Sequence, residues 1–334
     1  MSVEIMSRTG ELTGGGVTGV THRSPVRAGM RHHPLVGVGV ALASAAAFGT
    51  SGPFAKSLLV SGWSPGLVTT LRLTLAALVL FVPTLMALRG KWGVLWRSKW
   101  LVVGYGLTGV AGAQLAYFNA VTHLSVGVAL LLEYLAPTII VGWLWARHRQ
   151  TPRRLTVTGI GLSMIGLLLV LNLAGGARVS LIGVAWGLVA AVCLTMYFLL
   201  SDQVDADLPP IALAGVGLFV GTVALWTAGL LGIVDLAKGA TSVDLAGSMV
   251  AWWVPLLVIA LLAAAFAYVT GIVAVRMLGA KVASFVALTE VLFAVLFAWL
   301  VLSELPSPIQ LGGGVLIIAG LVAVRTDESR RPAA

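Results

Sequence analysis

A long segment occurs twice in this chain, and this duplication limits the folds that it can adopt. Residues 111–170 align with residues 265–324 without a gap. Identical residues recur at Ala120 and Ala274, Leu124 and Leu278, Trp145 and Trp299, Gly159 and Gly313, and Gly166 and Gly320. The pattern predicts two copies of one structural unit.

The charged residues at the ends of the two copies do not match. Four arginines follow an apolar stretch of the first copy, at Arg147, Arg149, Arg153 and Arg154. The second copy has Glu304 there instead, while its Arg276 and Lys281 fall where the first copy has no basic residue. Because cytoplasmic loops collect Lys and Arg, we expect the copies to cross a membrane in opposite orientations, an arrangement typical of transporters.

The composition excludes a soluble protein. The chain is 59% hydrophobic and 10% charged, whereas soluble domains carry roughly 25% charged residues. The pI near 10.3 would suit nucleic-acid binding, but the basic residues separate apolar runs of membrane-spanning length, so membrane orientation accounts for them. The single cysteine, Cys193, has no partner within the chain for a disulfide and is interpreted as a packing residue.

The expected fold is an all-α integral membrane protein of ten transmembrane helices, arranged as two inverted five-helix repeats. A helix needs about 20 apolar residues to cross the hydrocarbon. The expected spans are 35–59, 66–88, 101–121, 125–146, 155–173, 181–202, 209–233, 253–277, 280–303 and 309–325. An odd number of spans in each copy enforces the inversion. Both termini are expected in the cytoplasm, where most Lys and Arg residues then lie.

The spans predict four regions. Residues 1–33 are expected to form a disordered cytoplasmic tail, because they contain no apolar stretch of signal-peptide length. The first repeat is expected at 34–174, the second at 180–325, and a cytoplasmic C-terminal tail at 326–334.

Two stretches resemble a known family. Residues 287–324, ALTEVLFAVLFAWLVLSELPSPIQLGGGVLIIAGLVAV, are similar to the second EamA domain of the drug/metabolite transporter superfamily. Residues 117–145, YFNAVTHLSVGVALLLEYLAPTIIVGWLW, resemble the matching part of the first domain. The resemblance extends over roughly residues 35–325 and implies a carrier that works by alternating access.

One shorter run points to a substrate class. Glu133-Tyr134-Leu135-Ala136-Pro137 is similar to the Glu–aromatic–x–x–Pro of threonine/homoserine-exporter-like members. This similarity implies export of amino acids or related small metabolites. Efflux of cationic drugs is the alternative. The Gly-, Ala-, Val- and Arg-rich composition indicates a bacterium, and hence a multi-pass protein of the bacterial plasma (inner) membrane.

Three charged residues are predicted well inside spans: Glu133, Glu290 and Arg72. Each needs a partner, water or a proton, since an ionised side chain at such depth costs at least about 2.5 kcal/mol. We expect Glu133 and Glu290 to face one central cavity from opposite repeats, where they bind a cationic group or exchange a proton; the alternative is a structural carboxyl. Arg72 meets a substrate carboxylate or forms a buried ion pair.

Further polar residues lie at similar positions in the spans: Gln114, Tyr117, Asn119, Tyr134, Tyr268 and Thr289. They are expected to line a substrate cavity or to form hydrogen bonds between helices. Pro53 and Pro137 remove backbone hydrogen bonds and are predicted to kink their spans. The glycines of the fifth and tenth spans, among them Gly159 and Gly320, predict close helix packing.

These residues favour a secondary active transporter. The chain has no phosphate-binding Gly-x-x-x-x-Gly-Lys-Ser/Thr loop, so ATP is not the expected energy source. No catalytic or metal-binding constellation appears, which argues against a membrane-embedded lipid enzyme, and a passive facilitator would not need paired carboxylates. The expected partners are a small-molecule substrate, the lipid bilayer and protons, with no cofactor, metal or nucleic acid. Nothing in the sequence indicates an oligomeric state.

Overall fold

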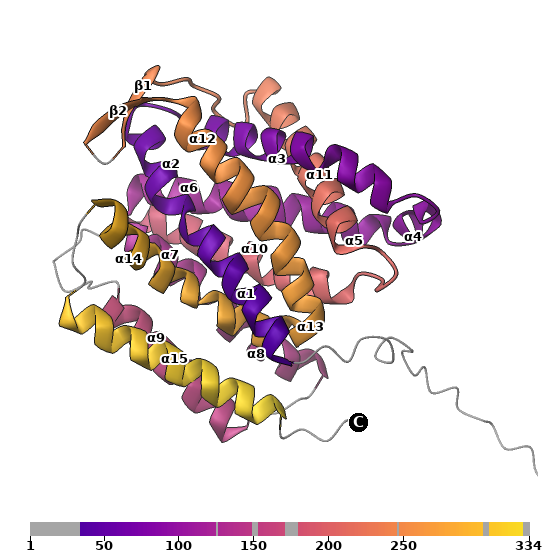
Figure 1. Ribbon diagram of the computed structural model, residues 1–334, viewed down its shortest axis with the longest axis vertical. Helices are drawn as coiled ribbons and strands as arrows, with labels where there is room; N and C mark the ends of the chain where they lie inside the picture. The colour runs from indigo at the N-terminus through magenta and orange to yellow at the C-terminus, as the bar shows by residue number, and fades with distance from the viewer. Residues whose placement is uncertain are drawn as a thin grey trace, which may run out of the picture. The chain divides into compact units, whose positions relative to one another are not determined.

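The computed structural model describes residues 34–124, 126–148, 153–170, 180–245, 247–302 and 307–329. These residues are mostly helical, with one two-stranded hairpin (Figure 1). The tail expected at 1–33, most of the expected join between the repeats, Arg149, Glu304 and the last five residues lie outside the described residues.

The first half of the chain contains short helices and one π-helical segment. Its elements are α1 (Pro34–Gly49), α2 (Ser51–Val60), α3 (Pro65–Ala87), α4 (Trp92–Arg97), α5 (Lys99–Gly104), the π segment η1 (Tyr105–Gly112), α6 (Ala113–His123), α7 (Val126–Glu133), α8 (Ala136–His148) and α9 (Arg154–Val170). Consecutive elements can belong to one candidate span. For example, α1 and α2 together form an apolar run over Leu35–Val60 that is long enough to cross a membrane.

The second half repeats this plan and adds a hairpin. Its elements are α10 (Leu181–Gln203), α11 (Pro210–Leu230), β1 (Ser242–Leu245), β2 (Ser248–Ala251), α12 (Trp253–Ala260), the π segment η3 (Leu261–Phe266), α13 (Ala267–Ala287), α14 (Thr289–Leu302) and α15 (Pro308–Ser329). The two strands pair antiparallel, with Val243 opposite Val250. Helix α15 continues beyond residue 325, where the sequence predicted the end of the last span.

Length and composition identify the chain as an all-helical membrane protein. Seven described helices are long and apolar enough to cross a bilayer, and two shorter apolar helices cover Arg154–Leu169 and Leu311–Val324. Large apolar side chains such as Leu78, Phe81 and Val82 of α3 are exposed on the helix surface. Lipid accommodates such a surface, whereas water would not.

Both prolines that the sequence analysis singled out follow interruptions between helices. Helix α1 ends at Gly49 and α2 begins at Ser51, two residues before Pro53. Helix α7 ends at Glu133 and α8 begins at Ala136, next to Pro137. The ring of a proline clashes with the carbonyl four residues earlier, which is that of Gly49 or Glu133. The breaks therefore lie where the proline rings disfavour a continuous helix.

A third interruption lies at Gly279. The apolar helix Trp253–Ala287 has 35 residues and would measure about 52 Å if it were straight, which exceeds the bilayer thickness of about 40–45 Å. Gly279 has φ 78° and ψ 158°, a conformation that glycine adopts without a steric penalty. The chain therefore turns at Gly279, between the spans expected at 253–277 and 280–303.

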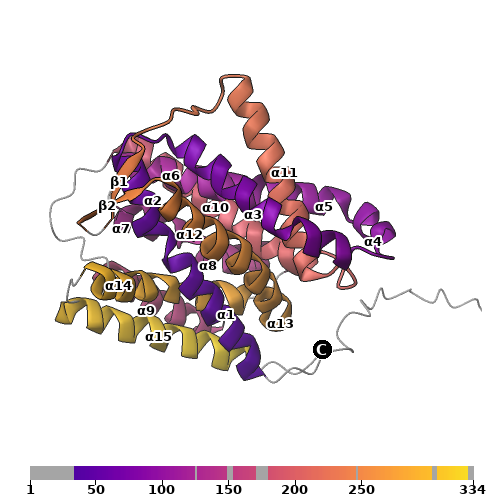
Figure 2. The same cartoon turned by 45° about the horizontal axis from the view of Figure 1, so that its top comes forward.

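Helices α9 and α15 lie side by side, as Figures 1 and 2 show. Glycines bring their backbones together: a Cβ atom on Gly159 would lie 2.8 Å from the carbonyl oxygen of Gly320, and one on Gly166 would lie 2.6 Å from that of Gly313. The close packing that the sequence predicted for these glycines is therefore present, because a larger residue would push the helices apart.

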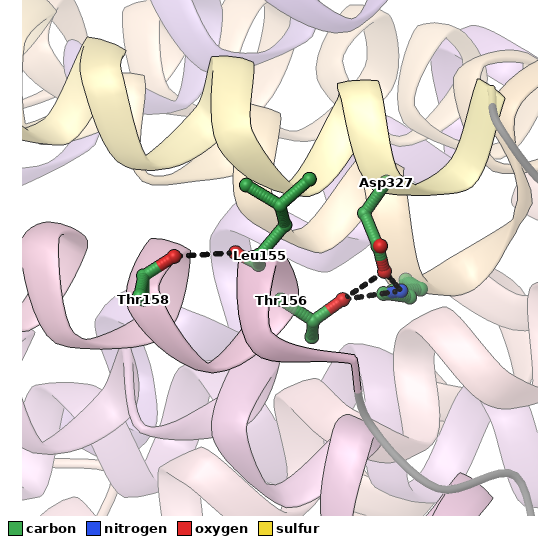
Figure 3. A network of polar contacts seen from close by, with 5 residues as sticks. Leu155, Thr156, Thr158 and Asp327 are labelled. Carbon is green, nitrogen blue, oxygen red and sulfur yellow. Dashed lines mark hydrogen bonds and ion pairs between the residues drawn. The ribbon is translucent and has the colours of Figure 1, made fainter.

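A buried polar network fixes this helix pair to α13. Figure 3 shows Thr156 of α9 and Asp327 of α15 pointing toward each other. The Thr156 hydroxyl donates to Asp327 Oδ2 at 2.6 Å, and Lys281 Nζ donates to Thr156 Oγ1 at 3.0 Å. Lys281 Nζ lies 3.8 Å from Asp327 Oδ2, and both side chains are buried. The sequence predicted Asp327 in the C-terminal tail at 326–334, whereas it belongs to α15.

We expect Asp327→Asn to lower the stability of the purified protein, because it deprives a buried ammonium group of this carboxylate. Breaking a buried pair costs about 3–5 kcal/mol. The measurement is the thermal unfolding midpoint in detergent. Asp205→Asn removes the carboxylate of a partly exposed ion pair with Arg97 and serves as the control, with an expected loss of about 1 kcal/mol or less. Equal midpoints for Asp327→Asn and wild type would contradict this expectation.

Candidate functional site

The candidate site is a cluster of charged and polar side chains built around Arg72. Arg72 belongs to α3 and has no exposed surface. Its Nη1 atom donates to Ser51 Oγ of α2 at 2.9 Å and to Gln114 Oε1 of α6, and its Nη2 atom donates to the carbonyl oxygen of Ala263 in η3. One guanidinium thus connects α3 with three other helical segments.

Arg72 does not form an ion pair with a glutamate. In the described part of the chain, neither Glu133 nor Glu290 has a carboxylate oxygen within 4.0 Å of its guanidinium. Both carboxylates nevertheless interact electrostatically with Arg72. The Nε atom of Arg72 is buried and has no hydrogen-bond partner among the described residues. The guanidinium therefore keeps an N–H group that can bind an acceptor.

The two glutamates occupy helix ends beside breaks. Glu133 is the last residue of α7 and is buried, while Glu290 is the second residue of α14 and is partly buried. Each carboxylate lies close enough to the other for their charges to interact. Two negative charges so near each other in a medium of low dielectric constant repel strongly. A proton or a cationic group of a bound molecule would relieve this repulsion.

Three tyrosines complete the cluster. The Tyr134 hydroxyl lies within interaction range of the Glu290 side chain. Tyr117 is buried beside both glutamates and Arg72. Tyr268 donates to the carbonyl oxygen of Gly109 at 3.4 Å and lies against the side chain of Gln114. The cluster therefore offers one cation, two carboxylates and several hydroxyl groups from both halves of the chain.

Two residues proposed from the sequence donate to backbone carbonyl groups three or four residues earlier in the chain. Asn119 Nδ2 donates to the carbonyl oxygen of Leu115 at 2.7 Å, and Thr289 Oγ1 donates to that of Val286 at 2.7 Å. Thr289 thereby satisfies a carbonyl group at the break between α13 and α14. Pro53 and Pro137 affect the candidate site through the helix interruptions that precede them.

The π segments are the part of the site that sequence reasoning missed. Segment η3, residues 261–266, aligns with residues 107–112 within η1. Each segment supplies a backbone carbonyl to the cluster: Ala263 accepts from Arg72, and Gly109 accepts from Tyr268. Such segments occur frequently at functional sites. The polar residues Gln114 and Tyr268 that follow the segments are equivalent in the repeat, which was the available signal.

We expect Arg72→Met to reduce the yield and the unfolding midpoint of the protein, because it removes the positive charge beside two glutamates. Adding Glu290→Gln should partly restore both quantities, since one negative charge is then removed as well. Size-exclusion profiles and thermal unfolding in detergent measure these effects. Lys56→Met is the control, because Lys56 is an exposed residue of α2. A double variant no more stable than Arg72→Met would show that charge compensation is not the role of Arg72.

Within the described residues, no group of three His, Cys, Asp or Glu side chains could hold a metal ion. The cluster offers charged groups and hydrogen-bond donors and acceptors. It has the composition expected for recognition of a small polar molecule within the membrane.

Comparison with known proteins agrees with this architecture. The sequence pattern of the EamA-like transporter family matches residues 35–172 and again residues 181–326. The chain is 25% identical over 298 residues to the uncharacterized inner membrane transporter YicL of Salmonella typhimurium, an alignment that covers 87% of this chain and 95% of YicL. A crystal structure of another protein superposes with a TM-score of 0.70 at 20% identity, covering 90% of this chain and 99% of the other, and shows that the fold is shared.

The two family matches together cover most of the chain and correspond to its two halves. The protein therefore belongs to the EamA-like transporter family, and it is a multi-pass membrane transporter rather than an enzyme.

Proposed function

We propose that the protein is a secondary active transporter that exports amino acids or related small metabolites across the bacterial plasma membrane. The observation that carries this proposal is the central cluster, in which one buried arginine and two glutamates from opposite halves lie within electrostatic range of one another. A molecule with an amino and a carboxyl group complements such a site, because its charges can meet the glutamates and the arginine respectively.

The proposed topology has ten spans in two inverted repeats, at 34–174 and 180–325, with both termini in the cytoplasm. Support comes from the turn at Gly279, which divides the 35-residue apolar helix into one complete crossing and the beginning of the next. The break after Glu133 and the break at Leu288 also lie close to equivalent positions of the duplication. Inverted repeats of this kind permit access to a central site from either side.

Transport in this proposal uses the repulsion between Glu133 and Glu290. With no cargo bound, a proton on one carboxyl group relieves the repulsion. A cargo ammonium group does the same when it binds, so cargo and proton compete for one location. Alternating exposure of the cluster to the two sides then couples outward movement of cargo to inward movement of protons.

We expect Glu133→Gln to abolish accumulation driven by a proton gradient, because a neutral amide neither releases a proton nor attracts an ammonium group in the same way. Proteoliposomes with purified protein would be tested with a panel of radiolabelled amino acids, with and without an imposed pH gradient. Gradient-driven accumulation by wild type should fall at least tenfold in Glu133→Gln. Asp244→Asn removes an exposed carboxylate of β1 and should leave it unchanged. A Glu133→Gln protein that accumulates substrate normally at every pH would overturn proton coupling at this residue.

A second candidate function is efflux of aromatic cations. It is favoured by the tyrosines beside the glutamates, because a π face and a carboxylate together attract cations. The same proteoliposomes distinguish the two functions: amino acids should compete poorly with ethidium if the cargo is an aromatic cation, and ethidium should compete poorly with amino acids in the other case.

A further inference from the structure

Buried polar atoms without partners gather at one end of the helices, away from the central cluster. They are the hydroxyl groups of Tyr105 in η1 and Ser201 in α10, and the Nε and Nη2 atoms of Arg276 in α13. Among the described residues, the two Arg276 atoms have no hydrogen-bond partner, while the Tyr105 and Ser201 hydroxyl groups lie within interaction range of each other without the geometry of a full hydrogen bond. Tyr105 and Ser201 have no exposed surface, so a ligand that accepts or donates a hydrogen bond here would lower the cost of burying them.

One edge of the Arg276 guanidinium, formed by Nε and Nη2, has no hydrogen-bond partner among the described residues. Its Nη1 atom donates to the carbonyl oxygen of Leu208, which leaves Nε and Nη2 on another edge of the group. Two parallel N–H groups on one edge match the two oxygen atoms of a carboxylate. In the part of the chain that the structure describes, no carboxylate forms an ion pair with Arg276.

The carboxylate that interacts electrostatically with Arg276 has other partners. Asp205 interacts electrostatically with Arg276, but its Oδ2 atom lies 3.7 Å from Arg97 and its Oδ1 atom accepts from the backbone of Asp207 at 3.0 Å. The loop between α10 and α11 is acidic, although the expected topology places it on the cytoplasmic side, where basic residues are usual. Lys91 and Arg276 donate to the backbone carbonyl groups of Asp207 and Leu208, so the loop lies against the Arg276 side chain.

A row of tyrosines connects this place with the central cluster. The Tyr105 and Tyr197 rings lie 5.7 Å apart, and the Tyr197 and Tyr268 rings lie 5.7 Å apart. The Tyr197 hydroxyl is buried, has no partner within the described residues and packs against Gly271. Tyr268 lies beside Gln114, which accepts from Arg72. Hydroxyl groups therefore follow one another from Arg276 to the cluster.

We propose that Arg276, together with Tyr105 and Ser201, is a carboxylate-binding site that receives the cargo on the cytoplasmic side. The inference rests on the proposed function for its orientation and for the class of cargo. Nε and Nη2 are closed to solvent in this conformation, so the cargo reaches them when the loop at 204–208 moves. The carboxylate binds at Arg276 first and passes along the tyrosines to the central cluster.

Ligand binding to purified protein in detergent tests the site without requiring transport. The probes are L-leucine and L-leucinol, which differ in whether a carboxylate is present. Arg276→Lys retains a positive charge and a donor for Leu208 but lacks the two-donor edge. We expect it to need at least tenfold more leucine than wild type for the same rise in unfolding midpoint, and leucinol to act equally on both. Arg89→Gln is the matched control, because it removes a positive charge from an exposed residue near Lys91, at the same end.

Three results would overturn the site: no response of wild type to leucine, an equal response to leucinol, or an unchanged leucine response in Arg276→Lys. Amino-acid uptake by proteoliposomes separates this inference from the proposed function. Uptake by wild type with an unchanged leucine response in Arg276→Lys rejects the site alone. A weakened leucine response in Arg276→Lys, with no amino-acid uptake by wild type, rejects the proposed function and retains the site.

Discussion

The structure depends on the absence of water from the hydrocarbon, which leaves each backbone and charged group to find a partner within the protein. Continuous helices satisfy this requirement but offer a ligand only side chains. This chain interrupts its helices at a few places, and at these places carbonyl groups accept hydrogen bonds from other helices. Ala263 accepts from Arg72, and Gly109 accepts from Tyr268. The irregular backbone is tolerated because it is buried against polar side chains of the protein.

The duplication explains why a charged site can exist between the halves. Each copy supplies a π segment, a broken helix and a carboxylate near the break, so the cluster combines equivalent parts of both halves. The two ends are not equivalent. Lys281, Thr156 and Asp327 form a buried network at one end, while the first copy has glycine, Gly127, at the position aligned with Lys281. The two copies therefore differ in the polar contacts that they make at corresponding ends.

Much of this arrangement could be predicted from the sequence, because covalent geometry and the cost of buried charge depend little on tertiary detail. Proline geometry predicted interruptions near Pro53 and Pro137, and the scarcity of charges inside spans selected Arg72, Glu133 and Glu290. Other features depend on contacts between side chains and backbone that only the folded structure reveals. Asn119 bonds to a carbonyl of its own helix, and the π segments depend on contacts between helices. The sequence predicted Asp327 in a polar tail, whereas in the structure it belongs to α15 and lies beside Lys281.

The placement of Arg72 explains how such a site can remain stable and still bind a ligand. An arginine in a close ion pair with a glutamate would hold both charges in one geometry, and a ligand would have to break that pair. Here the guanidinium is held by Ser51, Gln114 and a backbone carbonyl, all of which are neutral acceptors. Its charge therefore offsets those of Glu133 and Glu290 through space, while the carboxylates keep lone pairs for another donor. Stability comes from the neutral hydrogen bonds, and in the proposed function the charges are left for the cargo.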